Sequence, residues 1–476
     1  MKSVFCQTEE ILNAVNALEP STNKKYNGKD DVSNGRIFAD VFKDVARFNS
    51  NARKWYVYTG KVWKEDQESL IVEDLAKKLY HALVINALKS DADNTYRNYV
   101  QKLGSRGKRD IMLKDARSYY PVSSDQFDTN KELLNCQNGT FNLTTGELLL
   151  HSPDHMISKI SNIIYNPEAK SSLWEKFVSD IMCDNPEMIA FLQQCLGYSI
   201  SPSTFLECFF VTYGETSRNG KGTLNTVIQK MLGDYAGTAS PDAFTSKKYK
   251  SSSDQANDAI ASLVGTNYVS VSEPEERMVL DSALVKALTG NDKLRVRKLY
   301  ESGFEYTASF KIWFNTNYLP QITDETVFQS GRVILIPFER HFSESEQDKR
   351  MKEKLTHDYI ISAVFNWCYQ GYLEVMKNDN LEMPESVKEA VRKYAITQDR
   401  IGEFLDECTV ESPEGKERFS RTYDAYKRFC INSNYHPFAK SKFKEKLQKK
   451  LEITEYNHQA YVIGIAFAED CPFIET

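Results

Sequence analysis

A lysine between two glycines, followed by a threonine, is the group of residues in this sequence best suited to binding phosphate. Lys221, Gly222 and Thr223 follow an apolar run at 206–213 and a polar loop at 214–220. Backbone N–H groups of such a loop, the dipole of a helix behind it and one lysine can together bind the phosphates of a nucleotide. The pattern therefore predicts a buried strand, a phosphate-binding loop (P-loop) and a helix.

The spacing of this loop departs from the usual phosphate-loop pattern, which has one residue fewer between its glycines and a Ser or Thr directly after the lysine. Here five residues separate Gly214 from Gly220, and Gly222 takes the hydroxyl position. We assign Lys221 to the β- and γ-phosphates of ATP and Thr223 to Mg²⁺. The residues expected to contact ATP are Gly214, Arg218, Asn219, Gly220, Lys221, Gly222 and Thr223. A plain glycine turn between a core strand and a helix is the alternative.

Two further apolar runs end in polar side chains of the kind that ATP hydrolysis needs. The run at 268–271 leads into Glu273 and Glu275, with Pro274 between them. We predict that Glu273 binds Mg²⁺ or activates water and that Glu275 is a second carboxylate. The run at 310–314 leads into Asn315 and Asn317. A solvated acidic turn and an ordinary strand-ending turn are the alternatives.

Composition limits the class of protein. The chain has 476 residues, of which 41% are hydrophobic and 26% charged, so we expect a soluble protein of several domains. Its net charge is −6, so any surface for nucleic acid must be local. Nine cysteines without a C-x-x-C pair do not predict a zinc site, and we expect reduced thiols. A signal peptide and a membrane span are not predicted, so we expect a cytoplasmic location.

Two local basic clusters lie in this acidic chain. The first surrounds a predicted hairpin and consists of Lys293, Arg295, Arg297 and Lys298. The second lies in a helix near the C-terminus and includes Lys440, Lys442, Lys446, Lys449 and Lys450. Because lysine contacts phosphate without reading bases, both clusters are predicted to bind DNA. Solvated charge, or packing of the second helix on an acidic neighbour, is the alternative.

The N-terminal region has less specific signals. Residues 53–66 alternate as two short strands around a turn, with Trp55, Tyr56, Tyr58 and Trp63. These aromatics fit either a half-buried hairpin or a stacking platform for bases. A basic stretch at 97–117 fits either a solvated helix face or a surface for DNA or a neighbouring subunit.

Four ordered segments carry a resemblance to a known family. Together these segments resemble the phage and plasmid primase-helicase family, with its poxvirus-type C-terminal region, whose ATPase belongs to the superfamily 3 helicases: LLNCQNGTFNLTTGEL, SLWEKFVSDIM, FLQQCLGYSI and YGETSRNGKGTL. The resemblance implies an α/β fold with an AAA+-like P-loop core at 201–345. Around it we expect an N-terminal α+β region at 1–125, a helicase-associated domain at 126–200, a helical connector at 346–400 and a winged-helix DNA-binding domain at 401–476.

The resemblance also implies an activity and further site residues. It implies an ATP-hydrolysing, ring-forming DNA helicase, a hexamer by expectation, that moves on single-stranded DNA during replication of a phage or mobile element in a bacterial cytoplasm. It selects Asn317 to position the attacking water or to sense the γ-phosphate, with Asn315 as the fallback. It also selects Arg332 to enter a neighbour's ATP site, although Gly331 replaces the family's first arginine, with Arg340 or Arg297 as substitutes. Origin DNA and a separate primase or initiator are the expected partners, and we expect no primase within this chain.

Three other functions fit parts of the pattern. The first is an origin-binding initiator ATPase that remodels DNA without processive unwinding. The second is a P-loop kinase of small molecules, which the residues at 272–276, Asn317 and the basic C-terminal region disfavour. The third is a binding module whose ATP site is inactive, which the irregular spacing of the loop allows.

Overall fold

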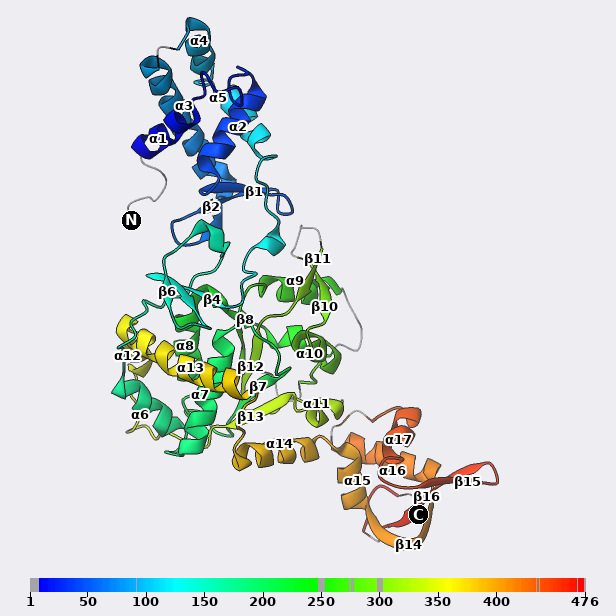
Figure 1. The fold of residues 1–476 in the computed structure, drawn as a ribbon. Helices are drawn as coiled ribbons and strands as arrows, with labels where there is room; N and C mark the ends of the chain where they lie inside the picture. The colour runs from blue at the N-terminus through cyan, green and yellow to red at the C-terminus, as the bar shows by residue number, and fades with distance from the viewer. Residues whose placement is uncertain are drawn as a thin grey trace.

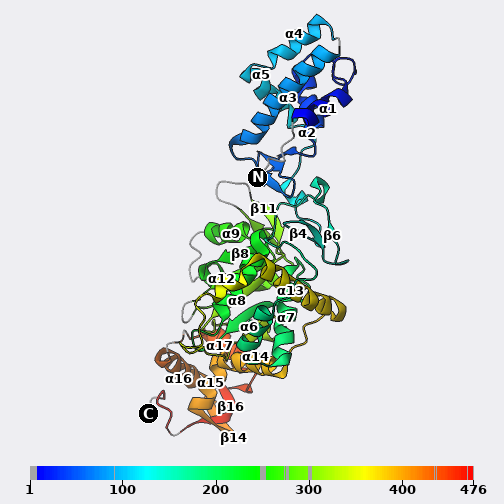
Figure 2. The same cartoon turned by 90° about the vertical axis from the view of Figure 1, so that its left-hand side faces the viewer.

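The computed structural model describes residues 8–90, 92–246, 253–272, 274, 278–297, 303–433, 435, 437–468 and 470–474. The chain forms an N-terminal lobe, a central core and a C-terminal domain, and the lobe and the C-terminal domain lie at opposite ends of the core (Figures 1 and 2). Among the described residues, no helix combines the length and apolar character needed to cross a bilayer.

The N-terminal lobe packs helices against a small antiparallel sheet. The hairpin expected at 53–66 is confirmed, because β2 pairs with β3. Trp55 and Trp63 are buried, so these indoles belong to the interior of the lobe and not to an exposed platform for bases. The elements are α1 (Thr8–Leu18), α2 (Asp31–Phe42), β1 (Ala46–Asn49), β2 (Lys54–Tyr58), β3 (Trp63–Glu65), α3 (Leu70–Lys89), α4 (Asn94–Lys102) and α5 (Arg106–Ala116).

A five-stranded parallel sheet organises the core. Its spatial order is β13–β7–β12–β9–β8, with bounds β7 (Phe209–Tyr213), β8 (Ala236–Ala239), β9 (Tyr268–Ser272), β12 (Lys311–Thr316) and β13 (Val333–Pro337). Helices cover both faces of the sheet, so its central strands are apolar on both sides and read as nearly continuous hydrophobic runs. The predicted α/β core is therefore confirmed as a parallel α/β fold.

Alternate residues of each strand enter two different hydrophobic cores. Phe210 and Trp313 stack with ring centroids 4.4 Å apart on one face, whereas Phe209 and Phe314 pack on the other. The first face packs against α6 (Ser172–Ile181), α7 (Pro186–Ile200), α8 (Lys221–Leu232) and α13 (Asp358–Asn378). The second packs against α9 (Ser253–Ser262), α10 (Ser282–Thr289) and α11 (Thr326–Gln329).

Two smaller β elements flank this core. β4 (Leu133–Cys136), β5 (Gly139–Asn142) and β6 (Leu148–Leu149) form a sheet between the N-terminal lobe and the core. β10 (Lys293–Val296) and β11 (Phe304–Thr307) form an antiparallel hairpin on the side of the core nearest that lobe (Figure 1). Because β11 ends just before β12 begins, the hairpin lies at the amino edge of the large sheet.

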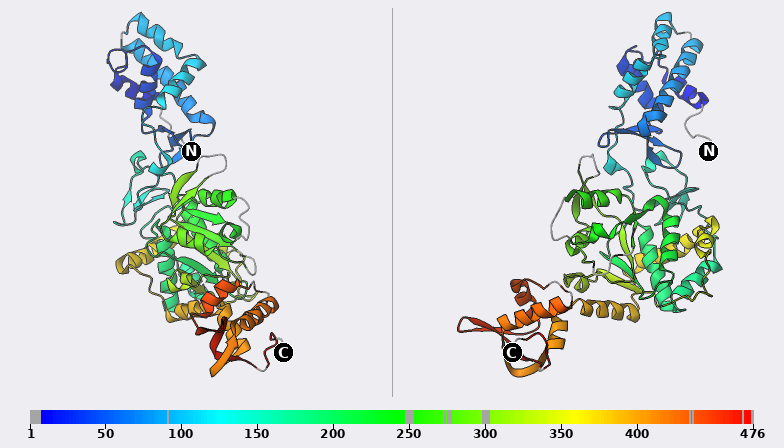
Figure 3. Two further views of the ribbon diagram at one scale, coloured as in Figure 1. Left: turned by 90° about the vertical axis from the view of Figure 1, so that its right-hand side faces the viewer. Right: turned by 180° about the vertical axis from the view of Figure 1, so that it is seen from behind.

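The C-terminal domain combines three helices with a three-stranded sheet. After α12 (Met351–Leu355) and α14 (Glu385–Thr397), the chain forms α15 (Arg400–Cys408), β14 (Thr409–Arg418), α16 (Phe419–Asn432), α17 (Lys440–Leu447), β15 (Ile453–Tyr456) and β16 (Gln459–Phe467). The strands pair in the order β14–β16–β15. The helix predicted around the C-terminal lysines is confirmed as α17, whereas β14 was not predicted. Figure 3 shows this domain joined to the core through α14.

Candidate ATP site

The candidate site lies at the carboxyl ends of two neighbouring strands, β7 and β12. From β7 the chain crosses to β8 at one edge of the sheet, whereas from β12 it crosses to β13 on the other side of β7. Ligands of open parallel sheets bind outside the carboxyl ends of the strands where connections diverge in this way. The loop at 214–220 and the start of α8 lie at this position.

The conformation of the loop explains two of its glycines. Gly220 has φ +88°, and a Cβ built on it would lie 2.4 Å from Cγ2 of Ile181. A Cβ on Gly214 would lie 2.3 Å from Nδ2 of Asn219, which donates to the carbonyl oxygen of Thr216 at 2.7 Å. A side chain at either glycine would therefore displace the loop. The absence of a side chain at Gly214 and Gly220 lets the loop backbone pack closely against Asn219 and Ile181.

Lys221 is a buried cation whose described hydrogen-bond partners are neutral. Its Nζ donates to Oδ1 of Asn317 at 2.6 Å and to the carbonyl oxygen of Gly214 at 3.3 Å. The residue is 7% exposed, and burial lowers its pKa to about 8. A desolvated ammonium is costly unless an anion pairs with it. The site is therefore suited to a phosphate group, and the structure brings together two residues that the sequence placed 96 positions apart.

Asn315, the other asparagine considered at this strand end, has a different environment. It lies within β12, where its Oδ1 accepts from Oγ1 of Thr212 at 2.8 Å and its Nδ2 donates to Oγ of Ser270 at 3.0 Å. These bonds link β12 to both neighbouring strands. Asn315 is therefore a structural link within the sheet, whereas Asn317 lies beyond the strand end and reaches Lys221.

The predicted magnesium ligands are described only in part. Thr223 is half-buried in the first turn of α8, and its N–H donates to the carbonyl oxygen of Gly220 at 3.0 Å. Glu273 and Glu275 lie outside the described residues. The strand that precedes them, β9, ends at Ser272, which pairs with Asn315 in parallel register. The assignment of Mg²⁺ to these residues stays a prediction.

Arg332 lies directly before β13, at the amino edge of the sheet and therefore opposite the phosphate loop. Its guanidinium forms an ion pair with Oε2 of Glu207 at 2.5 Å and donates to Oγ1 of Thr289 at 2.7 Å. The side chain is 15% exposed. Because the phosphate loop lies at the carboxyl edge, Arg332 does not face the ATP site of its own chain. Its predicted role in a neighbour's site stays a prediction.

The lowered pKa of Lys221 predicts how ATP binding depends on pH. Phosphate favours the charged lysine, so ATP binding raises the pKa of Lys221, and the lysine takes up a proton on binding wherever the free lysine is neutral. We expect affinity to be insensitive to this group below pH 8 and to fall by up to about tenfold per unit above it. Titration with a fluorescent ATP analogue between pH 7 and 9.5 measures this.

Lys221→Arg is the matched variant for this titration, because arginine stays charged throughout the range. Its affinity, whatever its absolute value, should not fall between pH 8 and 9.5. The same fall in Lys221→Arg and in the wild-type protein would show that another group titrates.

The predicted DNA-binding residues fall into two groups with different surroundings. On the β10–β11 hairpin, Lys293, Arg295 and Arg297 are exposed, and Lys298 lies outside the described residues. Lys293 forms an ion pair with Glu305 across the hairpin, at 3.5 Å. In the C-terminal domain, Lys440 and Lys442 are exposed. Three other lysines there contact carboxylates that precede the domain's second helix, α16. Lys446 and Lys449 contact Glu325, and Lys450 contacts Asp399.

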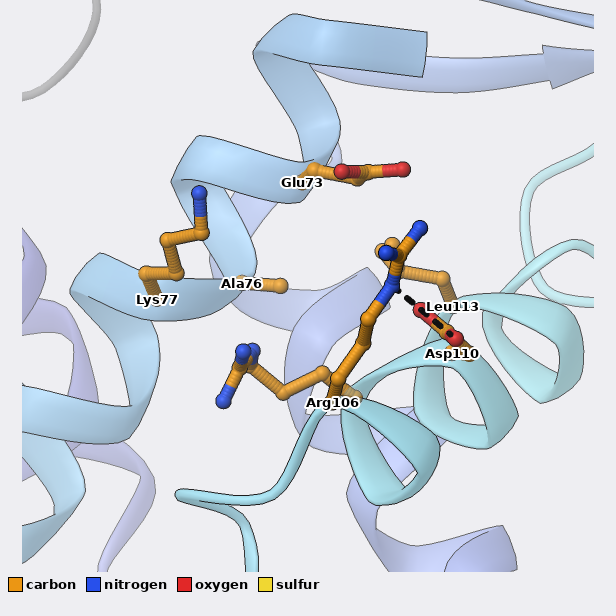
Figure 4. Close-up of a pocket in the computed structure, with 7 residues that line it drawn as sticks. Glu73, Ala76, Lys77, Arg106, Asp110 and Leu113 are labelled. Carbon is orange, nitrogen blue, oxygen red and sulfur yellow. Dashed lines mark ion pairs between the residues drawn. The ribbon is translucent and has the colours of Figure 1, made fainter.

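A small cavity of about 130 Å³ lies between α3 and α5 in the N-terminal lobe (Figure 4). It is lined by Glu73, Ala76, Lys77, Arg106, Arg109, Asp110 and Leu113. Arg109 donates to the carbonyl oxygens of Leu103 and Gly104, at the end of α4, at 3.1 and 2.6 Å. Residues of both charges line the cavity, and the Arg109 guanidinium is hydrogen-bonded to backbone carbonyl groups. This part of the basic stretch therefore has a structural explanation.

Comparison with protein families gives two matches. Residues 35–183 match the family described as D5 N terminal like, and residues 396–463 match the one described as Poxvirus D5 protein-like. The first covers most of the N-terminal lobe and the elements up to α6. The second covers most of the C-terminal domain, including α17. The matches therefore lie on both sides of the phosphate loop.

Three viral proteins named as candidate helicases are similar in sequence. The chain is 24% identical to one from Acanthamoeba polyphaga mimivirus, and the alignment covers 80% of this chain and 43% of the viral protein. It is 26% identical to one from Frog virus 3 over 46% of its length and 24% of that protein. It is 24% identical to one from Sputnik virophage over 50% of its length and 32% of that protein. The chain thus spans less than half the length of each relative.

Among solved structures, the apo form of the NrS-1 C-terminal region aligns with 88% of this chain and 96% of its own. The identity is 10% and the TM-score 0.45, which is too low to establish a shared fold. The likeness to known families rests on the sequence matches. Both D5 models match in chain order and three viral relatives are named as candidate helicases, so the chain is similar to the D5-type primase-helicase family over residues 35–183 and 396–463.

Proposed function

We propose that this chain is an ATP-dependent DNA helicase that acts in the replication of a virus or other mobile element. The observation that carries the proposal is the contact between the buried Lys221 and Asn317 at the carboxyl edge of the sheet. A desolvated cation beside a phosphate-binding loop, with an amide 2.6 Å from it, fits the γ-phosphate of ATP. The helicase names of the viral relatives support the same conclusion.

Each residue of the site has a proposed role. The N–H groups of the loop at 214–220 bind the phosphates, and Lys221 neutralises charge on the transferring γ-phosphate. Asn317 orients the attacking water. Thr223 and Glu273 would hold Mg²⁺, which would supply charge stabilisation at the phosphates, and Glu275 is the proposed second carboxylate.

Assembly into a ring, by expectation a hexamer, would complete this site with an arginine from a neighbouring chain. Arg332 lies at the edge of the sheet opposite the phosphate loop, so a head-to-tail arrangement could bring it toward the next chain's ATP site. In this single chain it is held by Glu207. The parallel core with its phosphate loop supports an AAA+-like assignment, in which such heterologous contacts close into a ring.

DNA contacts are proposed for both basic clusters. The hairpin residues Lys293 and Arg295 project from the amino edge of the core and suit the backbone of single-stranded DNA in a central channel. In the C-terminal domain, three helices and a hairpin support a winged helix, with α17 presented to duplex DNA at an origin. A separate primase or initiator is the proposed protein partner.

The rate of ATP hydrolysis with and without single-stranded DNA tests this function. We expect DNA to stimulate turnover severalfold, because a translocating motor couples its ATP cycle to the strand, and we expect strand displacement from a forked duplex. Nucleoside monophosphates in a parallel assay test the small-molecule kinase, because a kinase would consume ATP only with an acceptor.

Each alternative gives its own result. Stimulation by DNA without displacement from the fork, together with melting of origin duplex, would identify an initiator ATPase. Turnover that responds to a monophosphate and not to DNA would identify a kinase. ATP binding without turnover under any condition would identify a binding module.

A further inference from the structure

Two of the lysines proposed to bind DNA in the C-terminal domain, Lys446 and Lys449, already have a partner on the ATPase core. Lys446 forms a close ion pair with Glu325, and its side chain is only 10% exposed. Lys449 lies 3.9 Å from the same carboxylate, and Lys450 pairs with Asp399 at 2.5 Å. Glu325 belongs to the core, and Asp399 lies in the connection from α14 to α15. One face of the basic helix region is therefore turned toward the protein.

Glu325 belongs to a loop that starts at the ATP site. Residues 317–326, here called the docking loop, run from Asn317 beside Lys221 to the start of α11. Two hydrogen bonds attach the loop to the C-terminal domain and its connection. Oε1 of Gln398 accepts from the N–H of Ile322 at 2.9 Å, and Arg400 donates to Oε1 of Gln321 at 2.6 Å. Figure 1 shows α17 on the side of its domain nearest α11.

The contact between docking loop and C-terminal domain is specific but incompletely packed. Arg400 is 8% exposed and stacks over the ring of Tyr435 at 5.0 Å. A cavity of about 290 Å³ nevertheless lies at this junction, lined by residues that include Asn317, Tyr318, Arg400 and Tyr435. A contact built from a few polar bonds around a cavity can open at lower cost than a tightly packed core.

We propose that docking of the C-terminal domain on the docking loop is autoinhibitory for DNA binding. A lysine ammonium held by a carboxylate is not available to a DNA phosphate, so Glu325 and DNA compete for Lys446 and Lys449. DNA binding then requires the domain to leave the docking loop. This inference rests on the proposed DNA-binding function of the C-terminal domain and assigns it a mode of regulation.

Glu325→Gln tests the competition, because it removes the charge and keeps the size of the side chain. Binding to duplex DNA is measured by fluorescence anisotropy over a series of salt concentrations. We expect affinity to rise by about fivefold or more, the lower end of typical coupling between sites. If both lysines then contact phosphate, the plot of log K against log salt steepens by about 2. X-ray scattering should show a larger radius of gyration as the domain leaves the core.

Two sets of variants make the result specific. Glu374→Gln, an exposed carboxylate on α13, changes the net charge equally and should leave affinity and slope as in the wild type. Lys440→Ala with Lys442→Ala removes exposed lysines of α17, and the carboxylate beside Lys442 belongs to the same helix. This pair of substitutions should weaken DNA binding both with and without Glu325→Gln. Binding that needs Lys440 and Lys442 but is equal in Glu325→Gln and Glu374→Gln would overturn autoinhibition alone. Binding that ignores all of these residues would overturn DNA binding by α17, and autoinhibition with it.

Discussion

Lys221→Ala should lower the rate of ATP hydrolysis by about 10²–10³-fold or more, because it removes the group that stabilises charge on the γ-phosphate. ATP affinity should fall as well, since the ammonium is buried and has neutral partners in the structure. The fold should not suffer. Burial lowers the pKa of this lysine to about 8, so at pH 7 the folded chain holds an ammonium at a desolvation cost that alanine removes. Steady-state hydrolysis and thermal unfolding, measured side by side, separate the two effects.

Lys230→Ala is the matched control for this substitution. Lys230 is exposed and lies at the other end of α8. Its substitution therefore removes one positive charge from the same helix at a position away from the site. It should retain the wild-type rate of hydrolysis. If Lys221→Ala kept that rate as well, or if its midpoint of unfolding fell enough to explain the loss, the assignment of Lys221 to ATP would be wrong.

The site around Lys221 could be predicted because its signals are local. The apolar run before Gly214 predicts a strand, and Leu224, Val227 and Ile228 recur at helical spacing after it. All three are buried, at 3%, 0% and 1% exposure. The place of Asn317 in the site was implied by family resemblance, and its contact with Lys221 is explained by the parallel pairing of β7 and β12. The structure of a strand–loop–helix unit is determined mostly by its own local sequence.

Other parts of the fold depend on distant packing. The segment from Leu196 contains Gly197, Ser199 and Ser201, residues typical of a linker, yet α7 continues to Ile200. The reason is a close approach of two helices. A Cβ on Gly197 would lie 2.2 Å from the backbone N of Tyr372, and one on Gly371 would lie 2.1 Å from the carbonyl oxygen of Gln193. Glycine here serves helix packing, which no local window can show.

The C-terminal domain shows the same limit. β14 was missed because its sequence, TVESPEGKER, is polar and contains Pro413 and Gly415, which are typical of loops. It forms by pairing with β16, with an irregularity between Glu411 and Lys416. The charge of α17 was visible in the sequence, whereas its partner Glu325 lies 121 residues away. Composition indicates what a basic helix can bind, but only the fold shows what holds it.

Asn317→Ala should lower kcat by about 10²-fold while ATP affinity changes by only a few-fold. The amide of Asn317 is exposed beyond the end of β12 and touches Lys221, so its loss removes a positioning contact and leaves the loop at 214–220 intact. An interaction made chiefly in the transition state changes kcat more than binding. Single-turnover hydrolysis and equilibrium binding of an ATP analogue measure the two terms.

Asn315→Ala provides the contrast for this residue, from two positions earlier on the same strand. Its amide links β12 to Thr212 and Ser270, so truncation should cost about 1–3 kcal/mol of unfolding free energy by removing both of these hydrogen bonds. We expect its kcat per folded molecule to fall less than that of Asn317→Ala. The reverse order, with Asn317→Ala fully active and Asn315→Ala inactive yet stable, would move the catalytic amide to Asn315. That order would also imply that the bond between Lys221 and Asn317 holds the lysine in place only while ATP is absent.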